Sequence, residues 1–219
     1  NAKEILSVYE NTEEEKAEQV RMLEQLWDAG FTVAAHLLGK CWRDGMGVLP
    51  DDEQAELWFR RAAEAGHDFS QYALGKLLQS QKQMEEAVSW YEKAVAQGNS
   101  YAAYRLGKLY LEGKDVPKNT VKAVEYLTNA AQEGNQYAQY TLGKLYLTGE
   151  DVARDREQAY RWFWESASKG NEYAQFFLDH FNDNRSPNEL LSATKLLHHM
   201  GRIFQDNSIP PCPPGRQRA

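Results

Sequence analysis

The sequence has little cysteine and no long apolar run. Only two of its 219 residues are cysteines, Cys41 and Cys212, so no disulfide framework can stabilise the fold. Few cysteines are typical of proteins from a reducing compartment, and we therefore expect a cytoplasmic location. No stretch approaches the roughly 18 consecutive apolar residues of a membrane-spanning helix, so we expect no membrane span.

Basic residues are outnumbered by acidic ones. The chain has 25 Lys and Arg against 32 Asp and Glu, which gives a formal net charge of −7. Domains that bind nucleic acids or anionic membranes usually carry a basic surface, so this balance argues against both as partners. The sequence begins with Asn-Ala instead of Met, a pair typical of residues left by cloning, and we expect a fragment of a larger protein.

Motifs for catalysis are also missing. The sequence contains no phosphate-binding loop, nucleophile elbow, metalloprotease motif or Cys-x-x-Cys pair. The adjacent His198 and His199 would point about 100° apart on a helix, which suits two surface histidines better than two ligands of one metal ion. We therefore expect no catalytic residue, no metal, no cofactor and no enzymatic activity.

What the sequence does contain is a repeat. Its clearest marker is a glycine that returns at intervals of 36, 32, 36 and 36 residues, at Gly30, Gly66, Gly98, Gly134 and Gly170. The tripeptide Leu-Gly-Lys follows eight residues after each of the first four glycines and becomes Leu-Asp-His in the fifth copy. Self-similarity at a period of about 20–50 residues indicates a stack of supersecondary units.

Each unit is predicted to hold two helices. Apolar residues three and four apart place Ala102, Leu106 and Leu109 on one face of a helix, which we call helix A. A second stripe, helix B, recurs in every unit and begins in the first with Ala55, Trp58, Phe59, Ala62 and Ala63. Cys41 takes a helix A position that is leucine in the next three units, and we expect it to be buried in the core.

Turn chemistry separates these helices. The recurring glycine should end helix B, and asparagine should cap the next helix A at Asn99, Asn135 and Asn171. The loop between A and B offers helix B a cap at Asp51 or Asp52, Asn119 and Asp155, and the second unit lacks this loop. The glycine inside helix A costs about 1 kcal/mol relative to alanine, so its return predicts a close approach of neighbouring helices.

Residues 32–181 resemble the Sel1-like repeat, a relative of the tetratricopeptide repeat, through Ala-x-x-x-Leu-Gly, Gly-x-Gly-Val and the helix B stripe. The resemblance implies an all-α fold, an α/α solenoid (superhelix) of helix-turn-helix repeats with a concave face lined by A helices. Amphipathic helices before and after the repeats should cover the two ends of the stack. The expected division is an N-terminal capping segment, the repeat array, a C-terminal capping helix and a disordered proline-rich tail, at residues 1–31, 32–181, 182–206 and 207–219.

The resemblance also implies a protein-interaction scaffold that binds a partner or an extended peptide on its concave face. Two ladders of helix A residues point there: His36, Tyr72, Tyr104, Tyr140 and Phe176, and four residues on, Lys40, Lys76, Lys108, Lys144 and His180. A basic aromatic groove in an acidic chain would suit an acidic peptide. Alternatively, the aromatics stack on one another and the lysines pair with neighbouring glutamates. Our predicted binding residues are Tyr72, Lys76, Tyr104, Lys108, Tyr140, Lys144 and Phe176.

The C-terminal segment "LLSATKLLHHMGRIFQDNSIPP" carries a second resemblance, to the C-terminal region of relaxases, the mobilisation nucleases of conjugative elements. This resemblance implies that the array is an accessory region that recruits a partner. The nucleophilic tyrosine and metal-binding histidines of a relaxase nuclease domain are not in this sequence. An alternative function is a nucleic-acid-binding accessory domain, against which the net charge speaks.

Overall fold

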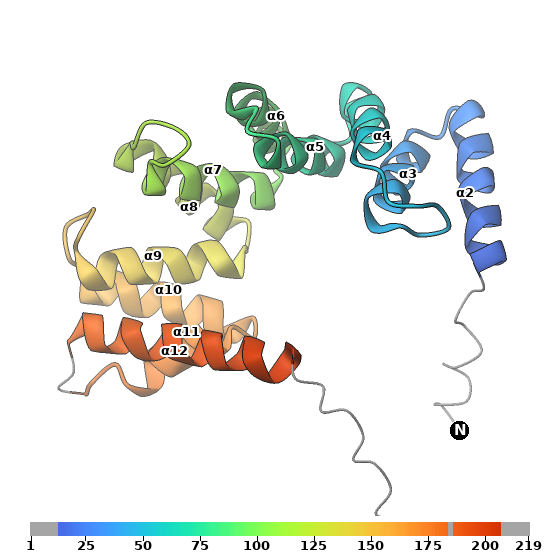
Figure 1. Ribbon diagram of the computed structural model, residues 1–219. Coiled ribbons are helices and arrows are strands. Elements are labelled where there is room, and N and C mark those ends of the chain that lie inside the picture. Colours follow the sequence, from blue (N-terminus) through green and yellow to red (C-terminus); the bar gives the residue numbers. More distant parts are fainter. Residues whose placement is uncertain (1–12, 184–185, 207–219) are drawn as a thin grey trace, which may run out of the picture. The chain divides into compact units, whose positions relative to one another are not determined.

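The computed structural model describes residues 13–183 and 186–206, and this part of the chain consists of helices joined by turns and loops, without a strand (Figure 1). The helices are α2 (Glu13–Asp28), α3 (Thr32–Asp44), α4 (Asp52–Glu64), α5 (Asp68–Ser80), α6 (Met84–Ala96), α7 (Ser100–Glu112), α8 (Thr120–Gln132), α9 (Gln136–Thr148), α10 (Arg156–Ser168), α11 (Glu172–Asp179) and α12 (Pro187–Asp206).

Consecutive helices pack as A/B pairs. Helix α3 packs on α4, α5 on α6 and α7 on α8, and the B helices α4, α6 and α10 also contact the A helices that follow them, α5, α7 and α11 (Figure 1). The second pair is joined by only three residues, 81–83, where the first and third use longer loops. The predicted all-α architecture of helix-turn-helix repeats is therefore confirmed, as is the missing loop of the second unit.

The chain divides into two compact units, of which unit 1 ends at Ala138 and unit 2 begins at Gln139, within α9. Unit 1 holds α2 to α8 around a core that includes Phe59, Leu74 and Tyr91. Unit 2 holds most of α9 with α10, α11 and α12. Its core contains the stacked rings of Phe163 and Phe177, whose centroids are 4.6 Å apart.

The glycine inside each A helix lies directly against the B helix of its own repeat. A Cβ on Gly39 would lie 2.5 Å from Cδ1 of Phe59, whereas carbon atoms in normal contact are about 3.5–4.0 Å apart. The other three A-helix glycines face Tyr91, Leu127 and Phe163 with equivalent distances of 2.8, 2.6 and 2.7 Å. The predicted close approach is confirmed, and its partner is a core side chain of helix B.

The recurring glycine reverses the chain from helix B to the next helix A. At Gly66 φ is +89°, in the left-handed region that favours glycine. The backbone N–H of Gly66 donates to Ala63 O (3.1 Å) and that of His67 donates to Ala62 O (3.0 Å). This pair of bonds is the Schellman motif, which confirms the predicted helix end.

Side chains cap the helices largely where the sequence predicts. The Asn99 side chain accepts a hydrogen bond from the backbone N–H of Ala102 at 3.0 Å, and Asp51, not Asp52, caps α4. The same contact is made by Asn119, Asn135, Asp155 and Asn171. In the second repeat His67 replaces the asparagine, and its Nδ1 accepts from the backbone N–H of Ser70 at 3.2 Å. The sequence did not predict this cap.

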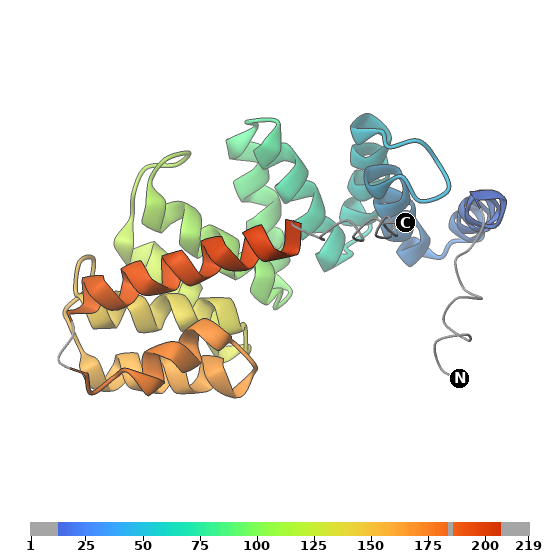
Figure 2. The ribbon, with the colours of Figure 1, turned by 60° about the horizontal axis from the view of Figure 1, so that its bottom comes forward.

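The first and last helices pack on the repeats. Val20 of α2 is buried against the core of α3 and α4, whereas Leu26 of the same helix is 44% exposed. Leu190 of α12 lies in the core of unit 2, and α12 runs beside α9 and α11 (Figure 2). The tail expected at 207–219 and the side chains of His198 and His199 lie outside the described residues.

Candidate functional site

In unit 1 each ladder tyrosine contacts an aromatic ring of the next A helix. The ring centroids of Tyr72 and Tyr101 are 6.1 Å apart, and those of Tyr104 and Tyr137 are 6.0 Å apart. Such tilted pairs are worth about 0.5–1.5 kcal/mol beyond the burial of area. Tyr101 and Tyr137 are half-exposed, at 49% and 50%, so these rings pack together and still present a surface.

The partners form a third series of aromatics that our sequence analysis missed. They stand three residues after the recurring glycine, at Phe69, Tyr101, Tyr137 and Tyr173. The sequence signal for this series is its constant spacing of three residues from the recurring glycine. These residues lie one helical turn before the ladder aromatics on helix A.

The ladder lysines of unit 1 stand one helical turn after the ladder tyrosines. Lys108 Nζ is 3.3 Å from Glu112 Oε1, and both side chains are about two-fifths exposed, so the pair contributes only about 0.3–0.5 kcal/mol. Lys76 lies near Asp44, whose pKa is lowered chiefly by its hydrogen bond to Arg43. The alternative in which a ladder lysine pairs with a neighbouring glutamate therefore holds for Lys108, although the pair is weak.

A polar cluster supports the rings between α5 and α7. The Tyr91 hydroxyl donates to Gln79 Oε1 at 3.0 Å, and Arg105 Nη2 donates to the same oxygen at 3.2 Å. Burial raises the pKa of Tyr91 to about 12, so this hydroxyl keeps its proton at neutral pH. The positive charge of Arg105 acts on Tyr72 of the ladder as well, which adds a cation that the ladder analysis did not include.

The first rung of the ladder differs from the others. His36 Nδ1 lies 2.8 Å from Ser70 Oγ, and His67 Nδ1 lies 3.0 Å from the same oxygen. Burial, followed by the charge of His67, lowers the pKa of His36 to about 4, so its ring is neutral at pH 7. Ser70 is fully buried, and its hydroxyl is therefore not presented to a substrate as a nucleophile.

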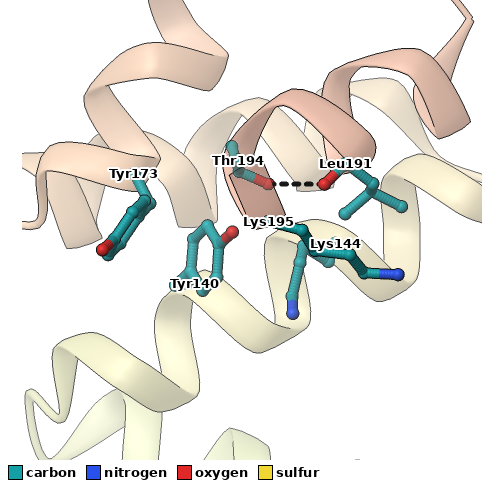
Figure 3. Close-up of a pocket in the computed structure, with 6 residues that line it drawn as sticks. All are labelled: Tyr140, Lys144, Tyr173, Leu191, Thr194 and Lys195. Carbon is teal, nitrogen blue, oxygen red and sulfur yellow. Dashed lines mark hydrogen bonds between the residues drawn. The ribbon is translucent and has the colours of Figure 1, made fainter. Parts of the chain in front are cut away.

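In unit 2 the ladder leads into a cavity of about 290 Å³, which we call the α12 pocket (Figure 3). Six residues of α9, α11 and α12 line it: Tyr140, Lys144, Tyr173, Leu191, Thr194 and Lys195. Lys144 Nζ lies 4.8 Å from the centroid of the Tyr140 ring, in a cation–π arrangement. The structure thus brings two predicted site residues together with a lysine and a threonine that only the packing of α12 supplies.

Phe176 is the predicted site residue that lies apart from the pocket lining. Its ring packs on His180, with centroids 4.3 Å apart, and edge-on against Phe177 in the core of unit 2. The backbone oxygen of Phe176 is 2.8 Å from His180 Nδ1. Phe176 and His180, the last members of the two ladders, therefore form an aromatic pair at the end of α11. The contacts of Phe176 are those of a packing residue.

The described residues offer neither a metal site nor a membrane span. Within residues 13–183 and 186–206, no three His, Cys, Asp or Glu side chains are close enough to hold a metal ion. None of the described helices combines the length and the apolar character needed to cross a membrane. Cys41 is a free thiol buried in the core of α3 and α4, as its repeat position predicted.

Comparisons with known proteins agree with this architecture. The model of the Sel1 repeat family matches residues 32–67, 69–99, 100–135 and 136–171. The solved Sel1 repeat protein from Oxalobacter formigenes is 28% identical with a TM-score of 0.70, and the match covers 84% of this chain and 80% of that one. A search of curated proteins found no match.

Two further solved structures are similar. The c5321 protein, a protective antigen of uropathogenic Escherichia coli strains, is 32% identical with a TM-score of 0.68 over 73% of this chain. The chain spans only 35% of the length of that protein. The immunity protein Pa5087 from Pseudomonas aeruginosa is 23% identical with a TM-score of 0.53, over 89% of this chain and 81% of that one, and shares the fold.

Proposed function

The chain belongs to the Sel1 repeat family, whose members generally mediate protein–protein interactions, and on that premise we propose that it is a non-catalytic scaffold for an extended, acidic peptide segment of a partner protein. The peptide would bind along the A helices. In unit 1 the binding residues would be Tyr72, Lys76, Tyr104 and Lys108, and in unit 2 Tyr140 and Lys144 would form a separate binding surface.

The observation that carries this proposal is the register of aromatic and cationic side chains in unit 1. Tyr72 and Tyr104 occupy the same position of successive A helices, and each is followed one helical turn later by a lysine. The rings form a half-exposed apolar surface, and the lysines follow one helical turn after the ladder tyrosines on the same helices. A peptide with apolar side chains between carboxylates would match both features.

The test uses peptides of defined origin. Twelve-residue peptides are selected on the protein from a random display library, and the affinity of the best one is measured by fluorescence anisotropy. The double variant Lys76→Glu/Lys108→Glu should bind about 1.5–3 kcal/mol more weakly, because it removes two charge-assisted contacts. Arg21→Glu/Lys82→Glu is the matched control, since it changes the net charge equally at two exposed positions outside the ladder.

The two variants must first be shown to fold alike. Exposed substitutions usually change stability by no more than about 0.5 kcal/mol, so both variants should melt close to wild type. Equal weakening by the ladder variant and the control would mean that only net charge matters. A ladder variant that melts much earlier would make the lysines structural, and the proposal would lose its support.

The cellular setting is a further part of the proposal. The resemblance of the C-terminal segment to relaxases supports an accessory region of a mobilisation protein, and the free buried Cys41 fits a reducing, cytoplasmic compartment. In that setting the scaffold would recruit a protein, with nucleic-acid binding as the alternative. A fluorescent single-stranded DNA oligonucleotide titrated at two salt concentrations separates them, since DNA binding should appear at low salt and fall steeply with salt.

A further inference from the structure

The α12 pocket combines aromatic, aliphatic and cationic side chains from three helices. The rings of Tyr140 and Tyr173, 6.3 Å apart, form one wall, and Leu191 adds an aliphatic surface from α12 (Figure 3). Lys144 enters from α9 and Lys195 enters from α12. None of the described residues that line the cavity is acidic, so its interior is apolar and its charge is positive.

The polar side chains can accommodate a carboxylate. The hydroxyl of Thr194 donates to Leu191 O at 2.9 Å, which fixes this turn of α12 beneath Lys195. The ammonium of Lys195 is exposed, and among the described residues no carboxylate lies within ion-pair distance of it. Two ammonium groups at the mouth of a small apolar cavity favour an anion that is joined to an apolar group.

The size of the cavity narrows the choice of ligand. Sites for drug-sized molecules measure about 300–1,000 Å³, and this one, at about 290 Å³, is just below that range and suits a single residue. An aspartate or glutamate within a peptide would satisfy the lysines but leave the tyrosine and leucine walls unfilled. A C-terminal apolar residue carries an apolar side chain and a free carboxylate on the same Cα, and so satisfies both.

We propose that the α12 pocket binds the C-terminal residue of the partner, with its apolar side chain between Tyr140, Tyr173 and Leu191 and its carboxylate between Lys144 and Lys195. This inference rests on the proposed scaffold function and specifies it further. It adds Lys195 as a binding residue and specifies that the C-terminal end of the partner enters unit 2.

The test compares a free carboxylate with its amide in the full 219-residue chain. Acetyl-Gly-Ser-Leu with a free C-terminus and the same peptide as the C-terminal amide are titrated into ¹⁵N-labelled protein and followed by NMR. The acid should shift the amide signals of residues 140–144 and 191–195 and should bind at least about tenfold more tightly than the amide, a difference of about 1.4 kcal/mol. Added salt should weaken the binding of the peptide acid and leave the binding of the peptide amide unchanged.

Variants assign the effect to the pocket. Lys195→Glu should lower the affinity for the peptide acid at least about fivefold and leave the affinity for the amide unchanged. Lys82→Glu, an equal charge change in unit 1, should alter neither affinity. Equal binding of acid and amide, shifts confined to other residues, or insensitivity to Lys195→Glu would overturn the inference. So would acetyl-leucine binding as tightly as the peptide, since the pocket would then be a site for free acids.

The two proposals fail separately. If library-selected peptides depend on Lys76 and Lys108 while the acetyl-Gly-Ser-Leu acid does not bind, the scaffold function stands and the pocket inference is wrong. If the acid binds as described while no selected peptide depends on unit 1, the pocket inference stands and the extended groove is wrong.

Discussion

The glycine inside helix A offers the sharpest test of the packing. In Gly39→Ala the new methyl group would lie 2.5, 2.6 and 2.9 Å from Cδ1, Cε1 and Cγ of Phe59. Phe59 is fully buried, with the His36 ring 5.8 Å away, so its ring can move only by displacing its neighbours. Alanine in place of glycine would by itself stabilise a helix by about 1 kcal/mol.

The cost of overpacking decides whether Gly39→Ala raises or lowers the free energy of unfolding. Extra methyl groups in a well-packed core typically cost about 1–3 kcal/mol, and a contact more than about 1 Å too short belongs at the upper end. We therefore expect Gly39→Ala to lower the free energy of unfolding by about 1–2 kcal/mol. Urea unfolding followed by circular dichroism at 222 nm measures this as a lower midpoint at constant slope.

A second substitution separates the clash from other causes. Phe59→Ala alone should cost about 3–5 kcal/mol, but in that background Gly39→Ala should stabilise by up to about 1 kcal/mol, because the methyl group enters vacated space. Asp179→Ala tests the same repeat position in α11, where Asp179 is exposed, and should change stability by less than about 0.5 kcal/mol. A Gly39→Ala protein as stable as wild type, or strictly additive double-variant energies, would refute the argument.

Two further predictions concern the histidines of the second repeat junction. His67→Asn restores the cap residue of the other repeats and should raise stability by about 0.5–1 kcal/mol in urea unfolding; unchanged stability would show that His67 caps equally well. The pKa of His36 is about 4 in the folded chain and 6.5 in the unfolded one, so the unfolded state binds more protons between these values. Stability should therefore fall as pH drops from about 6.5 to 4, by no more than about 1–2 kcal/mol because the ring is partly solvated, and His36→Tyr should flatten this dependence.

The sequence by itself determined the repeat architecture. Several helix boundaries are encoded locally: the Gly66 turn needs a positive φ, and Asn99 and Asp51 stand where a cap is required. The stripe of apolar residues and the return of glycine in helix A specify which faces meet. Because every repeat contacts mainly its neighbours, local signals repeated in register were sufficient to predict the fold class.

Only the tertiary structure decided how the candidate site is built. Lys108 and Lys144 occupy the same repeat position, and the sequence already offers Glu112 to Lys108 one turn later, but only the tertiary structure shows that Lys144 lines a cavity. That cavity exists because α12 packs on unit 2 and brings Lys195 beside α9, from a segment outside the repeat. Repeat periodicity cannot encode such a contact, since the angle at which a non-repeating helix packs depends on the shape of the surface beneath it.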